Sequence, residues 1–288
     1  MTPPDALQDP VAATPDNSSE PPVTRYVPRA GLFGRVNWLG VWSLYLREVR
    51  RFASVWAQTL VGPVVTSLLL LGVLVLVLRD RQILSGSVSF LEFVVPGIVM
   101  MAMMQNAFSN TSSTILISKV QGTMNDILMA PLSATELVVA FALGAATRAL
   151  VVGVLLLAAI APFVGLSIAN AGLILFNAVF ASLIMALLGL IAGLWSEKMD
   201  HVGAAQSFLV VPLTMLSGTF FSIERFPDTL RLIAQLNPVF YMIDGFRAGF
   251  IGHAEAVPAL NIVILLLLTG GLAALVIRLF YAGYKIRM

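Results

Sequence analysis

Long runs of apolar residues, separated by short polar breaks, dominate the sequence. The hydrocarbon core of a bilayer is about 30 Å thick, so a helix that crosses it needs roughly 20 such residues. Six segments meet this requirement, at about residues 55–78, 93–116, 136–164, 171–195, 202–221 and 258–281. The pattern therefore predicts an all-α, polytopic integral membrane protein with six transmembrane helices.

The composition agrees with a lipid environment. Hydrophobic residues make up 58% of the 288-residue chain and charged residues only 11%, whereas a soluble domain carries about 25% charged residues. A soluble fold of this size has too little interior to bury so many apolar side chains. The formal net charge of +2 is too small to indicate a nucleic-acid partner, and none is expected.

Before the first span, the chain divides into two parts. Residues 1–34 are small, polar and rich in proline, with no apolar core of a signal peptide, and we expect a disordered cytoplasmic tail. Residues 36–53 combine aromatic and aliphatic side chains at helical spacing with Arg47, Arg50 and Arg51 near the end. This pattern predicts an interfacial helix in the headgroup plane; the alternative is a basic anchor without a fixed helix. The transmembrane domain then extends over residues 35–288.

Basic residues beside the spans indicate the orientation, because cytoplasmic loops carry an excess of lysine and arginine. With both termini cytoplasmic, the inner side receives Arg25, Arg29, Arg35, Arg47, Arg50, Arg51, Lys119, Lys198, Lys285 and Arg287. The outer side then receives Arg79, Arg81, Arg225, Arg231 and Arg247. The count favours cytoplasmic N- and C-termini, as an even number of spans also requires them to share one side.

The sequence lacks the residues that most enzymatic chemistry needs. No glycine precedes any of the lysines Lys119, Lys198 and Lys285, so the chain contains no phosphate-binding P-loop. There is no cysteine, and the predicted topology places His201 and His253 on opposite sides of the membrane, so no metal site is expected. No nucleophile elbow is present. We expect a chain without catalytic activity and without a cofactor of its own.

Polar residues follow one side of the second span. Gln105 and Ser109 are four residues apart, as are Asn106 and Asn110, so each pair lies on one helical face. The two interpretations are the wall of a conduit and ordinary hydrogen bonding between helices.

Arg148 lies near the middle of the third predicted span, where a cation must face protein or water. No acidic residue within one or two helical turns can pair with it. It either contacts a substrate headgroup or a neighbouring subunit, or it is bonded to backbone carbonyls and polar groups of an adjacent helix.

The loop of residues 119–133 joins the second and third spans on the predicted cytoplasmic side. Apolar residues 127–129 follow Asp126, and Pro131 ends the segment, which predicts a short amphipathic helix. Such a helix either binds a partner or rests on lipid. Ser133 and Glu136 have the spacing of a capping box for the third span.

The segment of residues 226–250 is too polar for a span and too apolar for a free loop. Asn237 and Pro238 break any helix through it. Asp244 and Arg247 are three residues apart and can form an ion pair. We expect an outer re-entrant helical hairpin before the last span.

Three of these places resemble the type-2 ABC exporter permeases. They are Gln121-Gly122-Thr123 with residues 127–133, Leu216-Ser217-Gly218-Thr219 at the end of the fifth predicted span, and Leu236-Asn237-Pro238 with residues 241–247. The resemblance implies a bacterial inner (plasma) membrane protein that moves its substrate outward. It also implies a permease homodimer, each subunit docked on a separate ATP-binding cassette subunit that binds the ATP and Mg.

In that resemblance, the loop after the second span is the coupling helix to the ATPase, through Lys119, Gln121, Gly122, Thr123, Asp126, Leu128 and Pro131. Gln105, Asn106, Ser109, Asn110 and Arg148 are the candidates for the conduit lining, and Asn237, Pro238, Asp244 and Arg247 for the outer hairpin. The modest polar lining favours an amphipathic substrate, a drug or a lipid-linked molecule. Export of a polysaccharide or lipo-oligosaccharide and an ion-coupled secondary transporter are the alternatives.

Overall fold

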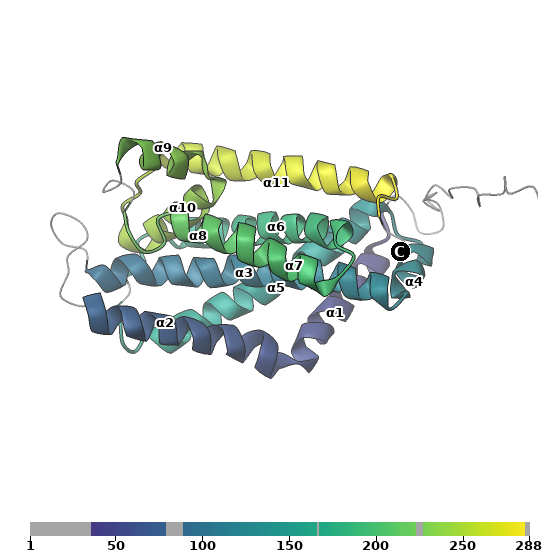
Figure 1. The fold of residues 1–288 in the computed structure, drawn as a ribbon, viewed down its shortest axis with the longest axis horizontal. Helices are drawn as coiled ribbons and strands as arrows, with labels where there is room; N and C mark the ends of the chain where they lie inside the picture. The colour runs from purple at the N-terminus through teal and green to yellow at the C-terminus, as the bar shows by residue number, and fades with distance from the viewer. Residues whose placement is uncertain (1–35, 79–88, 166, 223–226, 286–288) are drawn as a thin grey trace, which may run out of the picture.

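The structure is a computed structural model that describes residues 36–78, 89–165, 167–222 and 227–285. The predicted tail of residues 1–34 lies outside this part of the chain. Nearly all of the described chain is helical, which confirms the all-α prediction (Figure 1). The helices are α1 (Trp38–Ser54), η1 (Ala57–Val61), α2 (Gly62–Leu78), α3 (Phe90–Val120), α4 (Thr123–Met129), α5 (Ala134–Ile160), α6 (Ala171–Trp195), α7 (Met199–Ala205), η2 (Gln206–Val210), α8 (Val211–Leu216), α9 (Asp228–Leu236), α10 (Pro238–Ile251) and α11 (Pro258–Tyr281).

Five helices of the described chain are long and apolar enough to cross a membrane. They are Ala57–Val77, Phe90–Val120, Ala134–Ile160, Ala171–Trp195 and Pro258–Tyr281. The predicted span at 202–221 is not among them. In that stretch α7, η2 and α8 follow one another without a gap, but the helix ends at Leu216, five residues before the predicted end. The structure therefore shows five candidate spans where the sequence predicts six.

Prolines explain the two π-helical segments, η1 and η2. Each ends close before a proline, Pro63 in α2 and Pro212 in α8. Proline has no N–H to donate, so the preceding turn widens and takes bonds five residues apart. The N–H of Gly62 accordingly donates to Ala57, and that of Val211 donates to Gln206.

The core lies around α3, which packs most extensively against α6 and also contacts α5 and α10. In α3 the apolar window is 83% buried, whereas α2 and α11 are mostly exposed. These two helices form opposite flanks of the bundle in Figure 1. A bundle with a buried centre and apolar outer helices is what a lipid solvent permits, since the hydrophobic effect does not force those flanks inward.

Hydrogen bonds bring four segments together at one end of the bundle, which we call the α4 end. The Asn37 side chain donates to the Pro131 carbonyl, joining the start of α1 to the loop after α4. Lys285 donates to Glu197 at 2.9 Å, joining the chain after α11 to the α6–α7 loop. This bond lowers the pKa of the Glu197 carboxyl and raises that of the Lys285 ammonium, which keeps both groups charged.

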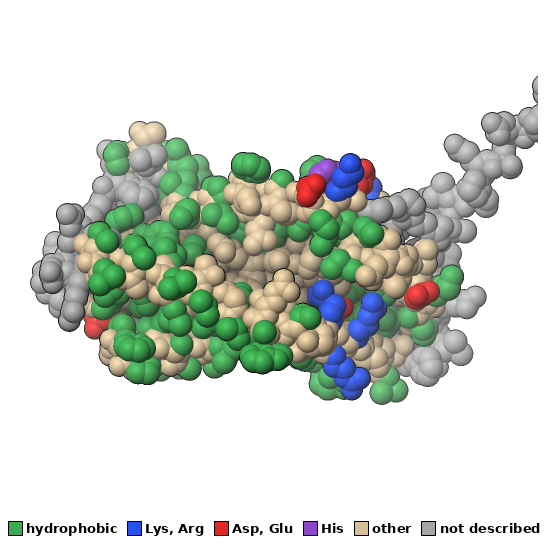
Figure 2. Space-filling view, turned by 60° about the horizontal axis from the view of Figure 1, so that its bottom comes forward, with side chains coloured by type: hydrophobic (Ala, Val, Ile, Leu, Met, Phe, Trp, Pro, Cys, Tyr) green, Lys and Arg blue, Asp and Glu red, His purple; other side chains and the backbone are tan. Residues whose placement is uncertain are grey.

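The opposite end is formed by α9, α10 and the α5–α6 loop. The N–H groups of Ala169 and Asn170 both donate to the Gly249 carbonyl in α10. In the view of Figure 2, the lysine and arginine side chains gather toward the α4 end, while apolar side chains cover the remainder of the bundle. By the positive-inside rule, an excess of lysine and arginine at one end of a bundle is typical of the cytoplasmic end.

Candidate functional site

The turn between α3 and α4 contains only Gln121 and Gly122. Gly122 has φ = 73°, in the left-handed region that glycine adopts without a steric penalty. This conformation reverses the chain directly after α3. Pro131 follows the end of α4, where the N–H of Ala130 donates to the Asp126 carbonyl. The sequence-predicted short helix is therefore present, at Thr123–Met129.

One face of α4 is buried and the other is presented outward. Met124 and Ile127 are buried against the bundle. Asn125 and Asp126 are exposed, and Met129 is 81% exposed. Leu128, which the sequence assigned to the contact with a partner, is only partly exposed, so Met129 is the apolar residue most available to a partner. The sequence does indicate this position, because Met129 is three residues after Asp126 and so lies on the same side of the helix.

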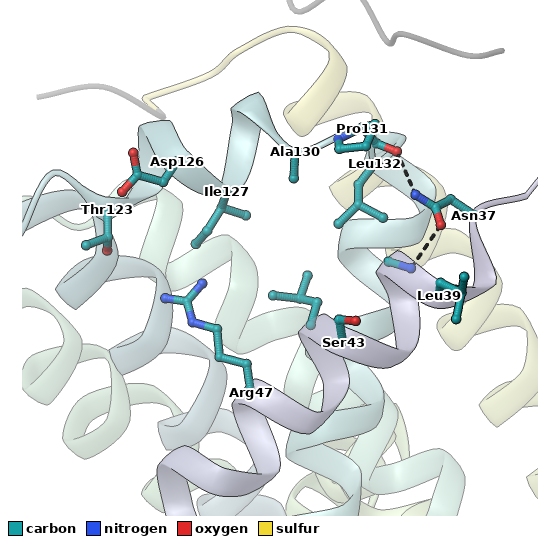
Figure 3. Close-up of a pocket in the computed structure, with 12 residues that line it drawn as sticks. Asn37, Leu39, Ser43, Arg47, Thr123, Asp126, Ile127, Ala130, Pro131 and Leu132 are labelled. Atoms are coloured by element: carbon teal, nitrogen blue, oxygen red, sulfur yellow. Dashed lines mark hydrogen bonds between the residues drawn. The ribbon is translucent and has the colours of Figure 1, made fainter. Parts of the chain in front are cut away.

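A groove of about 580 Å³ separates α1 from α4 (Figure 3). Arg47 extends from α1 toward α4, and Thr123, Asp126 and Ile127 line the α4 side. Asn37 closes one end, because its side chain both caps α1 by accepting from Gly40 and donates to Pro131. The groove therefore offers an apolar floor with a cation and a carboxylate at its rim.

The capping box predicted for the third span is confirmed and also attaches α1 to the bundle. The N–H of Glu136 donates to the Ser133 hydroxyl, and the Glu136 carboxylate accepts from the Ser133 N–H at 2.7 Å. The same carboxylate accepts from the N–H of Asn37 at 2.6 Å. The starts of α1 and α5 are thus joined next to α4.

Lys119 does not face the surface of the loop as the coupling-helix prediction implied. It lies in the last turn of α3 and is only 6% exposed. Its ammonium group donates to the carbonyls of Leu194 at 2.9 Å and Ser196 at 2.7 Å. These are carbonyls at the C-terminus of α6, where a cation also stabilises the helix dipole. Lys119 therefore joins α3 to α6 instead of facing a partner.

We expect Lys119→Gln to lower the free energy of unfolding by about 1–3 kcal/mol, because charge-assisted bonds to the carbonyls ending α6 are lost. The measurement is thermal unfolding of the purified chain in detergent. Lys198→Gln is the matched control, since Lys198 is an exposed lysine of the α6–α7 loop. Equal stability of the two variants would contradict the role assigned to Lys119.

Arg148 contacts the polar stripe of α3. Its guanidinium group donates to the side-chain oxygen of Asn106 at 3.0 Å, to that of Asn110 at 3.2 Å and to the carbonyl of Thr59 at 3.4 Å. These bonds are those of the second sequence interpretation, an arginine bonded to polar groups of adjacent helices, while contact with a headgroup stays a prediction. Gln105 and Ser109 lie on the same helix but are half-buried.

The contact with Thr59 places Arg148 next to the start of the first apolar stretch. Thr59 is in the first turn of the apolar stretch Ala57–Val77. The guanidinium is therefore level with the edge of that stretch, although the residue is in the middle of α5 by sequence. The reason is that α3 and α5 both continue beyond this level toward α4.

The polar cluster around Arg148 extends to α1, which the sequence did not predict. The Arg51 guanidinium donates to the Asn110 side-chain oxygen at 2.9 Å, also contacts Thr114, and pairs with Glu48 at 3.1 Å. Glu48 is only 1% exposed. Glu48 is buried because Gly144 of α5 packs closely against its Cβ. This contact is between distant parts of the chain, so the sequence around Glu48 gives no sign of it.

At the opposite end, α9 and α10 are two helices separated at Asn237, as the Asn237-Pro238 break predicted. The proposed ion pair within α10 is wrong. Asp244 accepts from the N–H groups of Glu255 and Ala256 at 3.0 and 2.9 Å. Arg247 points the other way, donating to the carbonyls of Phe93 at 3.1 Å and Gly218 at 2.6 Å. The two residues hold α10 to different neighbours.

Asn237 connects the two helices to α8. Its side chain donates to the Leu213 carbonyl at 2.9 Å and to the Ser217 hydroxyl at 2.7 Å, and its oxygen accepts from the N–H of Val239. Pro238 occupies the first turn of α10, where a missing N–H costs nothing. Entry of this segment into the outer leaflet stays a prediction.

An apolar helical bundle with an exposed short helix at one end and the buried helix α10 at the other is typical of a multi-pass membrane protein. Comparison with known proteins identifies its family. The family model of the ABC-2 type transporter matches residues 40–251. The chain belongs to the ABC-2 type transporter family.

Two relatives agree with this assignment. The chain is 31% identical over 215 residues to the inner membrane transport permease YadH of Escherichia coli (strain K12), an alignment that covers 75% of this chain and 84% of that protein. It is 24% identical over 222 residues to nodulation protein J of Neorhizobium galegae, covering 76% and 83% of the two chains.

Proposed function

We propose that this chain is the permease subunit of an ATP-driven exporter of the bacterial inner membrane, with ATP and Mg bound by a separate ATP-binding cassette subunit. The observation that carries the proposal is the outward face of α4. Asn125, Asp126 and Met129 form an exposed patch on a helix whose other face is fixed in the bundle. A rigid helix that presents a few polar and apolar anchors suits a partner groove.

The connections of α4 supply a path for the force. Asn37 and Glu136 join its following loop to the starts of α1 and α5, and Lys119 joins the preceding helix to α6. Closure of the ATPase against α4 then acts on α1, α3, α5 and α6 together. Nucleotide drives transport only if it favours one of two packings of these helices.

The proposal includes an orientation and an assembly. In this proposal the α4 end is cytoplasmic, because the ATPase and its nucleotide are there, and the start of α1 and the chain after α11 both lie at this end. This requires the continuous helix α7–η2–α8 to cross the membrane as well as the five candidate spans. Two copies of the chain form the transmembrane part, each with its own α4, and the conduit opens outward between them when both ATPases close.

An amphipathic molecule, a drug or a lipid-linked compound, is the substrate class best supported. An apolar cavity of about 410 Å³ lies among α3, α6, α8, α10 and α11. Trp195, Leu209, Met242 and Leu272 are among its lining residues. Such a lining solvates an apolar chain or ring and offers no partner to a hydrophilic sugar.

The test of the coupling proposal is the double variant Asp126→Arg with Met129→Asp. We expect it to lose binding of a co-expressed ATP-binding cassette subunit by at least about tenfold, because truncated or inverted anchors at an interface centre commonly cost more than 1.4 kcal/mol. Co-purification and substrate-stimulated ATP hydrolysis are the measurements.

The matched control is Met199→Asp with Asp200→Arg, which makes the same two replacements on exposed positions of α7 near the same end. It is expected to retain the ATPase. Failure of the wild-type chain to bind any ATP-binding cassette subunit would overturn the proposed function, and equal loss in both double variants would overturn the role of α4.

A further inference from the structure

The buried cluster of Glu48, Arg51, Asn110 and Arg148 carries more positive than negative charge. Glu48 supplies one carboxylate and pairs with Arg51. For Arg148 the described residues provide no acidic partner within 4 Å; its contacts are neutral oxygens. A half-buried guanidinium without a counter-charge is costly in apolar surroundings, so the cluster lacks one anion.

The two arginines also compete for a single acceptor. Both guanidinium groups donate to the side-chain oxygen of Asn110, at 2.9 Å from Arg51 and 3.2 Å from Arg148. Like charges that share one neutral oxygen repel each other, and an anion between or beside them removes that repulsion.

Unpartnered donors point to the same conclusion. The Asn110 side-chain N–H₂ and the Arg148 Nε–H are buried and have no hydrogen-bond partner, and Asn110 is 1% exposed. A buried donor without an acceptor loses its hydration and gains nothing in return. An anion at the exposed side of Arg51 adds the negative charge that the cluster lacks. Glu48 Oε1 is also unpartnered. Because it is a negatively charged acceptor, it repels an anion, and a Glu48→Gln variant tests this repulsion.

The depth of the cluster selects the kind of anion. The Thr59 carbonyl that Arg148 contacts is in the first turn of the apolar stretch Ala57–Val77. The cluster therefore lies at the end of the apolar stretch of η1 and α2 that is nearer to α4, and the Arg51 side chain is 33% exposed there. Basic groups between helices at this level bind the phosphates of anionic lipids.

We propose that Arg51 and Arg148 bind the phosphodiester of an anionic amphiphile at the headgroup level of the α4 end, the cytoplasmic leaflet in the proposed orientation. The amphiphile is a bilayer lipid or a transported molecule with the same headgroup chemistry. Binding requires neither ATP nor the ATPase, so its test is independent of the coupling experiment.

The experiment titrates the purified full chain, in a neutral detergent, with phosphatidylglycerol or with phosphatidylcholine of the same acyl chains, and counts bound lipid by native mass spectrometry. We expect wild type to prefer phosphatidylglycerol and Arg148→Gln or Arg51→Gln to weaken its binding about fivefold, the effect of one basic residue near a membrane surface. Phosphatidylcholine binding should not change.

Three further variants make the result specific. Arg50→Gln removes an exposed arginine of the same helix and should leave the preference intact. Glu48→Gln removes the competing carboxylate and should strengthen phosphatidylglycerol binding, a gain that a purely structural role does not produce. Arg148→Lys keeps the charge and should retain the preference, which also covers the case in which Arg148→Gln does not fold.

Several outcomes overturn the proposal. These are equal binding of the two lipids by wild type, loss in Arg50→Gln as large as in Arg148→Gln, and no gain in Glu48→Gln. Displacement of the lipid by millimolar glycerol phosphate would assign the site to a soluble anion instead. With the site established, movement of phosphatidylglycerol between leaflets on addition of the ATPase and ATP identifies it as cargo, and no movement identifies it as a resident lipid.

Discussion

Gly189→Val is expected to prevent accumulation of the folded protein. A Cβ at this position meets the Thr111 hydroxyl and the Phe108 carbonyl of α3 at less than contact distance. A backbone carbonyl in a helix cannot move aside as a flexible side chain does. The α3–α6 interface is the most extensive of the bundle, so we expect overpacking there to cost about 3 kcal/mol, the upper end of the usual range.

The measurement is the amount of monodisperse protein in detergent and its thermal unfolding temperature. Gly270→Val in α11 is the matched control, because a Cβ there meets no atom within 4 Å and valine in an apolar outer helix is tolerated by lipid. Wild-type yield and stability of Gly189→Val would show that the close approach of α3 and α6 is not required.

Arg247→Met is the second variant with a large expected effect. Arg247 is 2% exposed, its guanidinium bonds the carbonyls of Phe93 and Gly218, and its charge lies 3.7 Å from the centroid of the Phe93 ring. Hydrogen bonds to charged groups contribute about 1.5–3 kcal/mol each, so we expect a loss of about 3 kcal/mol or more in unfolding free energy. Methionine keeps most of the volume but none of the donors.

Arg231→Met is the control for this prediction, since Arg231 is an exposed arginine of α9. Thermal unfolding and limited proteolysis of the α9–α10 segment report on the two variants. Unchanged stability of Arg247→Met would mean that the desolvation cost of the buried cation cancels the bonds it makes.

The sequence alone determined most of the membrane architecture. Apolar length fixed the spans, because a helix must match the bilayer, and the predicted ranges 171–195 and 258–281 coincide with α6 and α11. Local chemistry fixed several ends, through the Ser133–Glu136 capping box and the break at Asn237-Pro238. The family resemblance over the loop after the second span and the Leu-Asn-Pro segment is confirmed by the match to the ABC-2 type transporter.

Only the tertiary structure decided what the polar and charged side chains contact. Lys119 reaches the end of α6, Arg247 reaches Phe93 rather than Asp244, and Arg148 lies level with Thr59. It also showed that the helix in the stretch at 202–221 ends at Leu216, and this helix is not among the five candidate spans. Apolar length is a property of a segment, and sequence records it directly. A long polar side chain instead takes whichever carbonyl or charge the neighbouring helices bring within reach, and that choice depends on residues distant in the sequence.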